Sequence, residues 1–166
     1  MVMQPDVHEP DCLRRFTRLC VDACARGWHE ANGGNLSYRL DEDDLVALAP
    51  LLEPESQWHG LKRAVPELAG AHVLMSASGA YLSNVAYDPS HICGIIQLDA
   101  CGESWRACWG FADDARPSSE LETHLAAYAT ALRAGDGADR VVYHAHAPHV
   151  IALSTLIEPS PRAWTR

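Results

Sequence analysis

The chain has 166 residues, of which 48% are hydrophobic and 21% are charged, and this balance predicts one globular domain over residues 1–166 and excludes disorder as the default. Its formal net charge of -9, without a cluster of lysines or arginines, argues against a nucleic-acid backbone as the main partner. No apolar run is long enough to span a membrane and the first residues lack a secretory signal, so we expect a cytoplasmic protein without a membrane partner.

The first part of the chain predicts a helix and a strand joined by a glycine-rich turn. Asp11 is expected to cap a helix that ends at Gly27, because apolar residues recur there at spacings of three and four. The Asn-Gly-Gly-Asn turn at residues 32–35 leads into residues 36–40, whose alternation predicts a half-buried strand. Residues 41–70 begin with acidic residues and contain scattered prolines, so we expect an insertion or long surface excursion with short helical turns.

The second part predicts strands, a helix, another strand and a last helix. The spacing of Ser119 and Glu122 is typical of a capping box, and Gly135 is the stop signal of that helix. The order shows neither regular βαβ alternation nor an internal repeat, so we expect an α/β fold of the layered, α+β-like kind. The expected strands are residues 73–76, 94–98, 105–109 and 139–146, and the last helix is residues 148–157.

The six cysteines form no C-x-x-C pair and no zinc-finger spacing. Several lie on apolar faces, and without a secretory signal we expect reduced core thiols. They are Cys12, Cys20, Cys24, Cys93, Cys101 and Cys108.

Two histidines, His144 and His146, close the predicted strand over residues 139–146. Side chains alternate along a strand, so both imidazoles are expected on one face, where they can share a metal ion. The same spacing also suits two partly buried polar residues that finish a strand, and it does not decide between these interpretations.

Glu120 lies in the first turn of the predicted helix, where the positive end of the helix dipole favours a carboxylate. If that helix end lies beside the histidine strand, the carboxylate can act as a metal ligand or as a general base. The alternative is an ordinary first-turn glutamate, because acidic residues are common at that position.

Two segments have the composition of anion-binding loops. Ser118 and Ser119 would present hydroxyl and backbone N–H groups at a helix N-terminus, and the glycines of residues 32–35 would let the backbone approach an oxyanion. Each signal is weak alone. Together with a metal and a base, they describe what stabilising an enediolate on a phosphorylated ketone requires.

The chain resembles the class II aldolase/adducin family in four motifs. Their order and intervals, including the long stretch 41–70, fit the rhamnulose branch of that family better than the shorter fuculose branch. The resemblance implies a central, largely antiparallel sheet flanked by helices. The motifs are Gly27–Leu36, Ser78-Gly79 ahead of Asn84-Val85, Pro117–Leu121 and Val141–Ala147.

This resemblance implies a zinc-dependent lyase that reversibly cleaves L-rhamnulose 1-phosphate into dihydroxyacetone phosphate and L-lactaldehyde. His144 and His146 would be zinc ligands, one ion per subunit, and Glu120 would be the acid/base at the nascent enediolate. A homo-oligomer, a tetramer, is implied as well. The residues implied to hold the substrate phosphate and hydroxyls are Asn32, Gly34, Asn35, Ser78, Gly79, Ser118 and Ser119.

The chain also departs from the family. It covers somewhat more than the first half of the family's pattern and lacks the later segment that supplies a third zinc histidine, so we expect a C-terminally incomplete domain. Glu120 is then a candidate third ligand, whereas His149, in a helix after Pro148, is expected to point away. Late strands missing from a sheet would leave an exposed edge, which predicts marginal stability or self-association.

Two alternatives to an aldolase stay open. One is a non-catalytic binding or assembly module, as in the adducin branch, and the other is a related sugar-phosphate epimerase or dehydratase. The presence of Glu120, His144 and His146 together favours an enzyme, because a scaffold has no need of that combination.

Overall fold

The computed structural model describes residues 10–55, 57–135 and 137–157, and the outer ends of the domain predicted over residues 1–166 lie outside this range. Six strands form one sheet in the order β2-β5-β4-β3-β1-β6, and every neighbouring pair is antiparallel. The strands are β1 (Asn35–Arg39), β2 (His59–Gly60), β3 (His72–Ser76), β4 (Cys93–Leu98), β5 (Ser104–Gly110) and β6 (Val141–His144).

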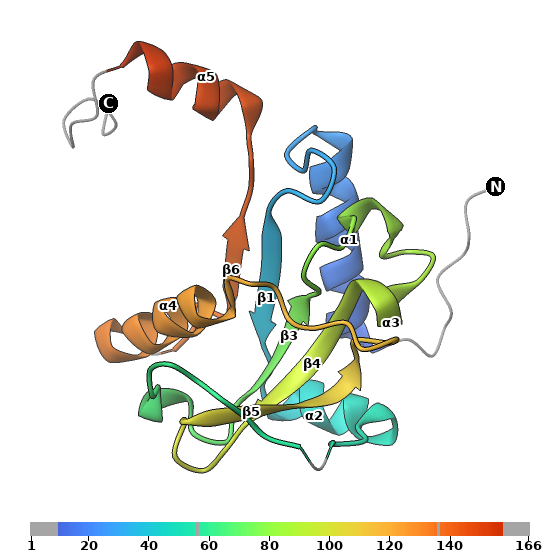
Figure 1. Cartoon of the computed structure of the whole chain (residues 1–166), viewed down its shortest axis with the longest axis vertical. Coiled ribbons are helices and arrows are strands. Elements are labelled where there is room, and N and C mark those ends of the chain that lie inside the picture. Colours follow the sequence, from blue (N-terminus) through green and yellow to red (C-terminus); the bar gives the residue numbers. More distant parts are fainter. Residues whose placement is uncertain (1–9, 56, 136, 158–166) are drawn as a thin grey trace.

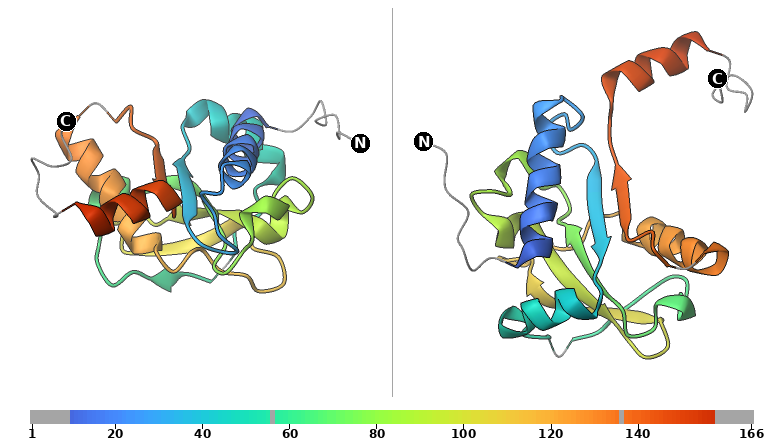
Figure 2. Two further views of the ribbon diagram at one scale, coloured as in Figure 1. Left: turned by 90° about the horizontal axis from the view of Figure 1, so that it is seen from above. Right: turned by 180° about the vertical axis from the view of Figure 1, so that it is seen from behind.

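Helices lie on both faces of this sheet, as Figures 1 and 2 show. They are α1 (Asp11–Ala25), α2 (Glu42–Leu48), α3 (Pro89–Ile92), α4 (Leu121–Ala134) and α5 (Pro148–Leu156), with short 3-10 turns η1 (Ala49–Leu51), η2 (Pro66–Leu68) and η3 (Leu82–Asn84). The layered α/β fold with a largely antiparallel sheet is therefore confirmed.

Alternation along the strands divides the core into two clusters. Leu74 and Ile95 face the side covered by α1 and α2, whereas Val73 and Ile96 face the side covered by α4 and η2. All four side chains are fully buried. The two clusters hold the sheet between helical layers, which is the arrangement that a sheet apolar on both faces requires.

Two predicted helix caps are wrong, although the helices themselves are present. Pro10 precedes α1, and Asp11 is already its first helical residue. The Asp11 carboxylate forms ion pairs with Arg14 and Arg15 and caps no backbone N–H group. At α4 the cap position is Glu120, and the expected capping box between Ser119 and Glu122 is not formed. Glu122 instead accepts a hydrogen bond from the backbone N–H of Lys62, at 3.1 Å.

Residues 41–70 are tied to the rest of the domain at several points. Asp41 caps α2 through a capping box with Asp44, and β2 pairs with β5 at one edge of the sheet. Leu48, Val65 and Leu68 of this segment are buried, Leu48 in the cluster beneath α1 and the other two in the cluster beneath α4.

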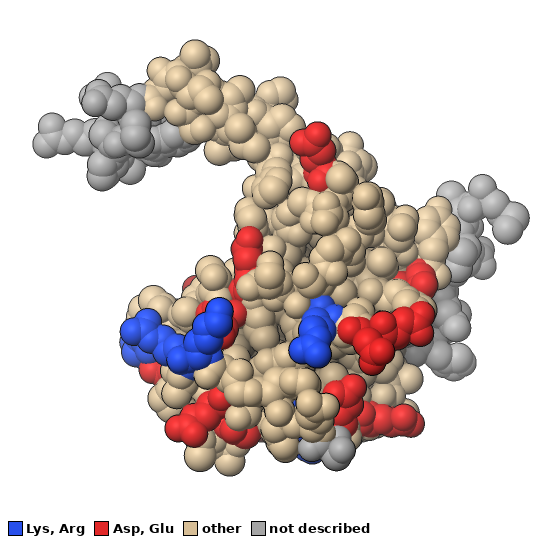
Figure 3. All heavy atoms as spheres, viewed as in Figure 1, with Lys and Arg blue, Asp and Glu red and all other residues tan. Residues whose placement is uncertain are grey.

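Helix α5 extends away from the sheet after β6 (Figure 2). It has no buried residue, and Val150, Ile151 and Leu156 are among its exposed apolar side chains. Helix α5 contains no lysine, arginine, aspartate or glutamate, so its spheres are tan in Figure 3. None of the described helices, α5 included, combines the length and apolar character needed to cross a membrane.

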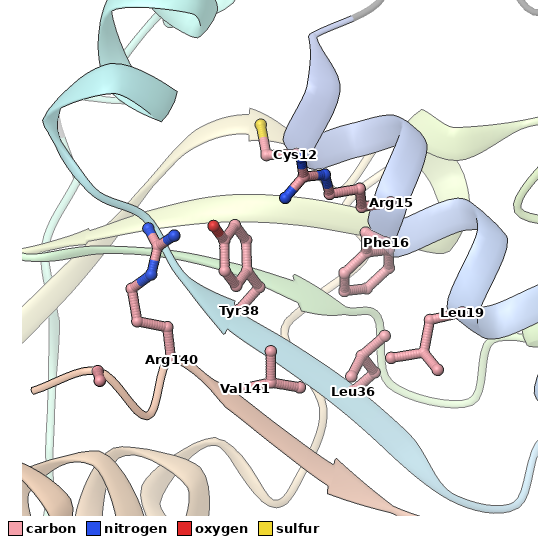
Figure 4. A pocket seen from close by; sticks show the side chains of 9 residues that line it. Cys12, Arg15, Phe16, Leu19, Leu36, Tyr38, Arg140 and Val141 are labelled. Carbon is pink, nitrogen blue, oxygen red and sulfur yellow. The ribbon is translucent and has the colours of Figure 1, made fainter.

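A cavity of about 300 Å³ lies between α1 and the strands β1 and β6 (Figure 4). Phe16, Leu19 and Leu36 form its apolar wall, and the Arg140 guanidinium lies over the ring of Tyr38, 4.9 Å from its centroid. Arg140 also forms ion pairs with Asp41 and Asp44.

Cys12, Cys20, Cys93 and Cys108 are buried in the core, as expected, whereas Cys24 is half-buried and Cys101 is exposed. Burial raises the pKa of the Cys20 thiol to about 12, so this thiol stays protonated at neutral pH.

Candidate active site

The predicted site residues come together where β1 and β6 pair. Asn35 is the register partner of His144, so the end of the glycine turn (residues 32–35) lies directly beside the histidine strand. The two loops that carry Ser78 and Ser118 approach the same end of the sheet, because Ala77 and Pro117 form a β-bridge. Segments more than a hundred residues apart in the sequence therefore meet at one place (Figure 1).

The two histidines lie on one side of the β6 end, as their spacing predicts. Their ring centroids are 4.9 Å apart with an angle of 58° between the ring planes. His144 is the last residue of β6, and His146 lies just beyond it, where its backbone N–H donates to the Trp28 carbonyl at 2.8 Å. Both histidines are partly buried.

Glu120 contacts the first of these histidines. Its Oε2 atom lies 3.0 Å from Nδ1 of His144, and about 40% of each side chain is exposed. Glu120 occupies the N-cap position of α4 without a side-chain capping hydrogen bond, so its carboxylate lies near the positive end of that helix. The expected juxtaposition of the helix start with the histidine strand is thus present.

The glycine turn packs against both histidines with no room for side chains. A Cβ at Gly33 would lie 2.7 Å from Nδ1 of His146, and one at Gly34 would lie 2.6 Å from the carbonyl oxygen of His144. Gly34 also has a φ of +76°, a conformation that favours glycine. His29 supports the turn through Nδ1, 2.7 Å from the carbonyl oxygen of Gly33, and its Nε2 lies 2.9 Å from the Tyr143 hydroxyl.

The serine loops form the remaining wall. Ser118 is buried, and its backbone N–H donates to the Ser76 carbonyl at 3.0 Å, while Ser119 is exposed. Ser78 and Gly79 are exposed as well, and a Cβ at Gly79 would lie 4.0 Å from Nδ2 of Asn32. The structure therefore brings the two serine loops together through the Ala77–Pro117 bridge, with Ser78, Gly79 and Ser119 exposed and Ser118 buried.

Sequence reasoning missed a layer of buried polar residues behind the site. His124 on α4 is 1% exposed, with Nδ1 2.7 Å from Oγ of Ser37 and Nε2 2.5 Å from Oδ1 of Asn35. Ser37 also lies 2.7 Å from the Tyr128 hydroxyl. The available signal was a histidine four residues after Glu120, on the apolar face of a helix, where a polar side chain requires partners.

The donors present fit part of a zinc site. The two imidazoles are neighbours, and the contact between Glu120 and Nδ1 of His144 leaves Nε2 of that ring free, a common arrangement around metal-binding histidines. Within the described part of the chain, however, no three His, Cys, Asp or Glu side chains are grouped to hold a metal ion. Glu120 contacts a histidine instead of completing a three-ligand group, and His149 is exposed on α5.

The chain belongs to the class II aldolase and adducin family: the family model described as the class II aldolase and adducin N-terminal domain matches residues 14–165. This match covers nearly all of the described structure, including each of the motifs that carried the resemblance.

Curated proteins similar to this chain include rhamnulose-1-phosphate aldolases. Those of Escherichia coli O157:H7 and Citrobacter koseri are 34% and 36% identical to this chain over 154 residues, which is 93% of this chain and 56% of theirs. The chain thus spans about half the length of these curated relatives. A solved sugar-phosphate aldolase from Thermotoga maritima has the same fold, with a TM-score of 0.65 and 22% identity over 85% of this chain and 55% of that one.

Proposed function

We propose that this chain acts as a zinc-dependent aldolase that cleaves L-rhamnulose 1-phosphate into dihydroxyacetone phosphate and L-lactaldehyde. The observation that carries the proposal is the contact between Glu120 and His144 at the edge of the glycine turn. It places a carboxylate beside a candidate metal ligand and a backbone cradle, and the relatives named for this reaction support the choice of substrate.

The reaction breaks the bond between C3 and C4 of the ketose. The hydroxyl on C4 gives its proton to solvent and becomes the aldehyde carbonyl, while the electron pair of the broken bond passes into an enediolate. Protonation of that enediolate at C3 yields dihydroxyacetone phosphate. Glu120, protonated from solvent, is the proposed donor at C3, and in the reverse direction its carboxylate removes the same proton, since it contacts His144 of the histidine pair.

The glycine turn and the serine loops are proposed to hold the substrate phosphate. Gly33 and Gly34 leave the backbone open to close approach, and Asn32, Ser78 and Ser119 are exposed. Hydroxyl and N–H donors suit a small anionic group better than an apolar ligand.

His144 and His146 are the proposed zinc ligands, and the chemistry that a bound zinc ion supplies is polarisation of the substrate carbonyl. By family resemblance, we also propose that the protein works as a homo-oligomer.

The test is cleavage of L-rhamnulose 1-phosphate by the 166-residue chain, followed through release of dihydroxyacetone phosphate with and without added zinc. We expect zinc-dependent release that is lost in His144→Ala. Consumption of the sugar phosphate without that product would indicate an epimerase or a dehydratase. No reaction at high protein concentration would favour the non-catalytic binding or assembly module for this chain.

A further inference from the structure

The buried polar layer contains a chain of hydrogen bonds that ends at the candidate site. It runs from Tyr128 through Ser37 and His124 to Asn35, with distances of 2.7, 2.7 and 2.5 Å. Three of these residues are almost fully buried and Asn35 is 7% exposed, so solvent does not compete for the bonds. Asn35 then reaches the site, where its Nδ2 lies 3.4 Å from Nδ1 of His144.

The direction of every bond in this chain follows from its last acceptor. Oδ1 of Asn35 can only accept, so Nε2 of His124 must carry a hydrogen. Nδ1 of a neutral His124 then accepts from the Ser37 hydroxyl. Because that hydroxyl has one hydrogen, Tyr128 must donate to Ser37. All donors therefore point from the core toward Asn35, and each is satisfied.

His124 is kept in the neutral form that this arrangement requires. Burial lowers the pKa of its imidazole, because a charged ring would lose its hydration among largely neutral neighbours. Nε2 faces an acceptor, Oδ1 of Asn35, and Nδ1 faces a donor, the Ser37 hydroxyl. A neutral ring satisfies both partners only in the tautomer with its hydrogen on Nε2.

We propose that His124 is a positioning residue that holds the Asn35 amide with its N–H₂ end toward the site. An amide has a donor end and an acceptor end, and rotation by 180° exchanges them. With His124 donating to Oδ1, the site receives the donor end, which attracts a phosphate or enediolate oxygen. Reversed, the amide would present a carbonyl oxygen that repels the same group.

His124 also fixes Asn35 relative to Glu120, because it follows Glu120 by one turn and its backbone N–H donates to the Glu120 carbonyl at 3.1 Å. The inference rests on the proposed function only in the identity of the anion that Asn35 meets. The orientation of the amide is a property of the protein alone.

The orientation can be measured in the unmodified chain by nitrogen NMR of the imidazole and amide groups. We expect His124 in the tautomer with hydrogen on Nε2, and slow exchange of the Asn35 side-chain amide hydrogens. A His124 ring with hydrogen on Nδ1, or a freely exchanging Asn35 amide, would overturn the proposal without any variant having to fold.

Two substitutions separate positioning from structural support. In His124→Gln the side-chain nitrogen can occupy the place of Nε2 and donate to Asn35, whereas in His124→Asn it occupies the place of Nδ1 and reaches only Ser37. We expect titration with inorganic phosphate to show near-native affinity for the glutamine variant and about tenfold weaker binding for the asparagine variant. Tyr128→Phe, which removes a buried hydroxyl without contacting Asn35, controls for lost stability.

Equal phosphate affinity in the glutamine and asparagine variants, with both folded, would overturn the role of His124. If the unmodified chain binds phosphate but releases no dihydroxyacetone phosphate, the proposed function fails while the positioning role is still decided by the two variants. If it binds no phosphate at all, the tautomer and the amide exchange decide that role.

Discussion

The middle of the sheet and its β1–β6 side are built from different side chains. Where β3 pairs with β4, both faces are apolar, and Val73, Leu74 and Ile96 are 0% exposed. Where β1 pairs with β6, Asn35 and Ser37 are buried polar residues. The middle of the sheet is therefore held by apolar burial, whereas the β1–β6 side, which carries the candidate site, contains buried polar groups that fix orientation more than they add stability.

The largest expected effect is on activity at the β1–β6 side. Glu120→Gln removes the proposed acid/base while keeping the size of the side chain, and we expect aldol cleavage to fall about 10²- to 10⁴-fold. Release of dihydroxyacetone phosphate measures the loss. Glu122→Gln, whose native carboxylate binds the backbone of Lys62 outside the site, is the matched control and is expected to keep its activity. A similar loss in both variants would mean that α4 as a whole, and not Glu120, is responsible.

The next effect is on stability in the middle of the sheet. Ile96→Ala leaves a cavity between β4 and α4, and we expect the free energy of unfolding to fall by about 2–5 kcal/mol. Denaturant unfolding measures this, with Ile96→Val as a milder control at about 0.5–1.5 kcal/mol. Phosphate affinity of the folded variant should be unchanged. A large change in affinity would show that the two regions are not separable.

A glycine substitution tests how tightly the turn packs against the histidine strand. In Gly34→Ala the new Cβ meets the carbonyl of His144 and the ring of His29 at a backbone φ of +76°, so we expect a destabilisation of about 1–3 kcal/mol. Gly27→Ala has a similar φ of +69° but nothing within 4 Å of its Cβ. The difference between the two unfolding free energies isolates the contacts with His144 and His29 together, and equal losses would mean that backbone conformation accounts for the whole effect.

The smallest effect concerns a histidine far from the site. Asp88 and Asp113 hydrogen-bond the exposed His91 and raise its pKa above the ordinary value of 6.5. A raised pKa in the folded state stabilises the protein below that ordinary value, and this contribution is lost as pH rises through the folded-state pKa. Thermal unfolding of the native protein against His91→Gln should therefore show a difference at pH 5 that shrinks by pH 8. A difference that grows over this range would contradict the assignment.

His124 is the opposite case, because burial lowers its pKa. As pH falls through the ordinary pKa of 6.5, His124 binds a proton in the unfolded chain but not yet in the folded protein. The contribution of His124 to the free energy of unfolding is therefore fully present above pH 6.5 and is lost as pH falls toward the lowered folded-state pKa. His124→Gln should reduce this acid sensitivity in thermal unfolding between pH 7 and pH 5. An unchanged pH dependence would mean that His124 titrates alike in both states.

Much of the fold could be predicted because alternation and helical spacing are local signals. The expected strand at residues 36–40 is β1 shifted by one residue, and the helix ending at Gly135 is α4. The cap at Ser119 was wrong because spacing alone does not show which donor a side chain meets: the neighbouring Ser118 hydroxyl accepts from the Glu120 N–H at 3.3 Å.

The candidate site was predictable only in part. His144 and His146 share a face for a local reason, their spacing of two along a strand. That Glu120 lies beside His144 depends on how α4 and β6 pack, which periodicity does not encode and which only the family resemblance implied. The position of His124 on the apolar face of a helix indicated that it needs partners, but not which ones, because they lie on β1, 87 and 89 residues away in sequence.

The proposed proton transfer by Glu120 can be tested most directly on one product alone. The chain is incubated with dihydroxyacetone phosphate and zinc in deuterated water, and the C3 position is followed by proton NMR. We expect deuterium to enter at C3 with the native chain and with Glu122→Gln but not with Glu120→Gln. No exchange with the native chain, or equal exchange with Glu120→Gln, would contradict the assignment of Glu120 as the base of this site.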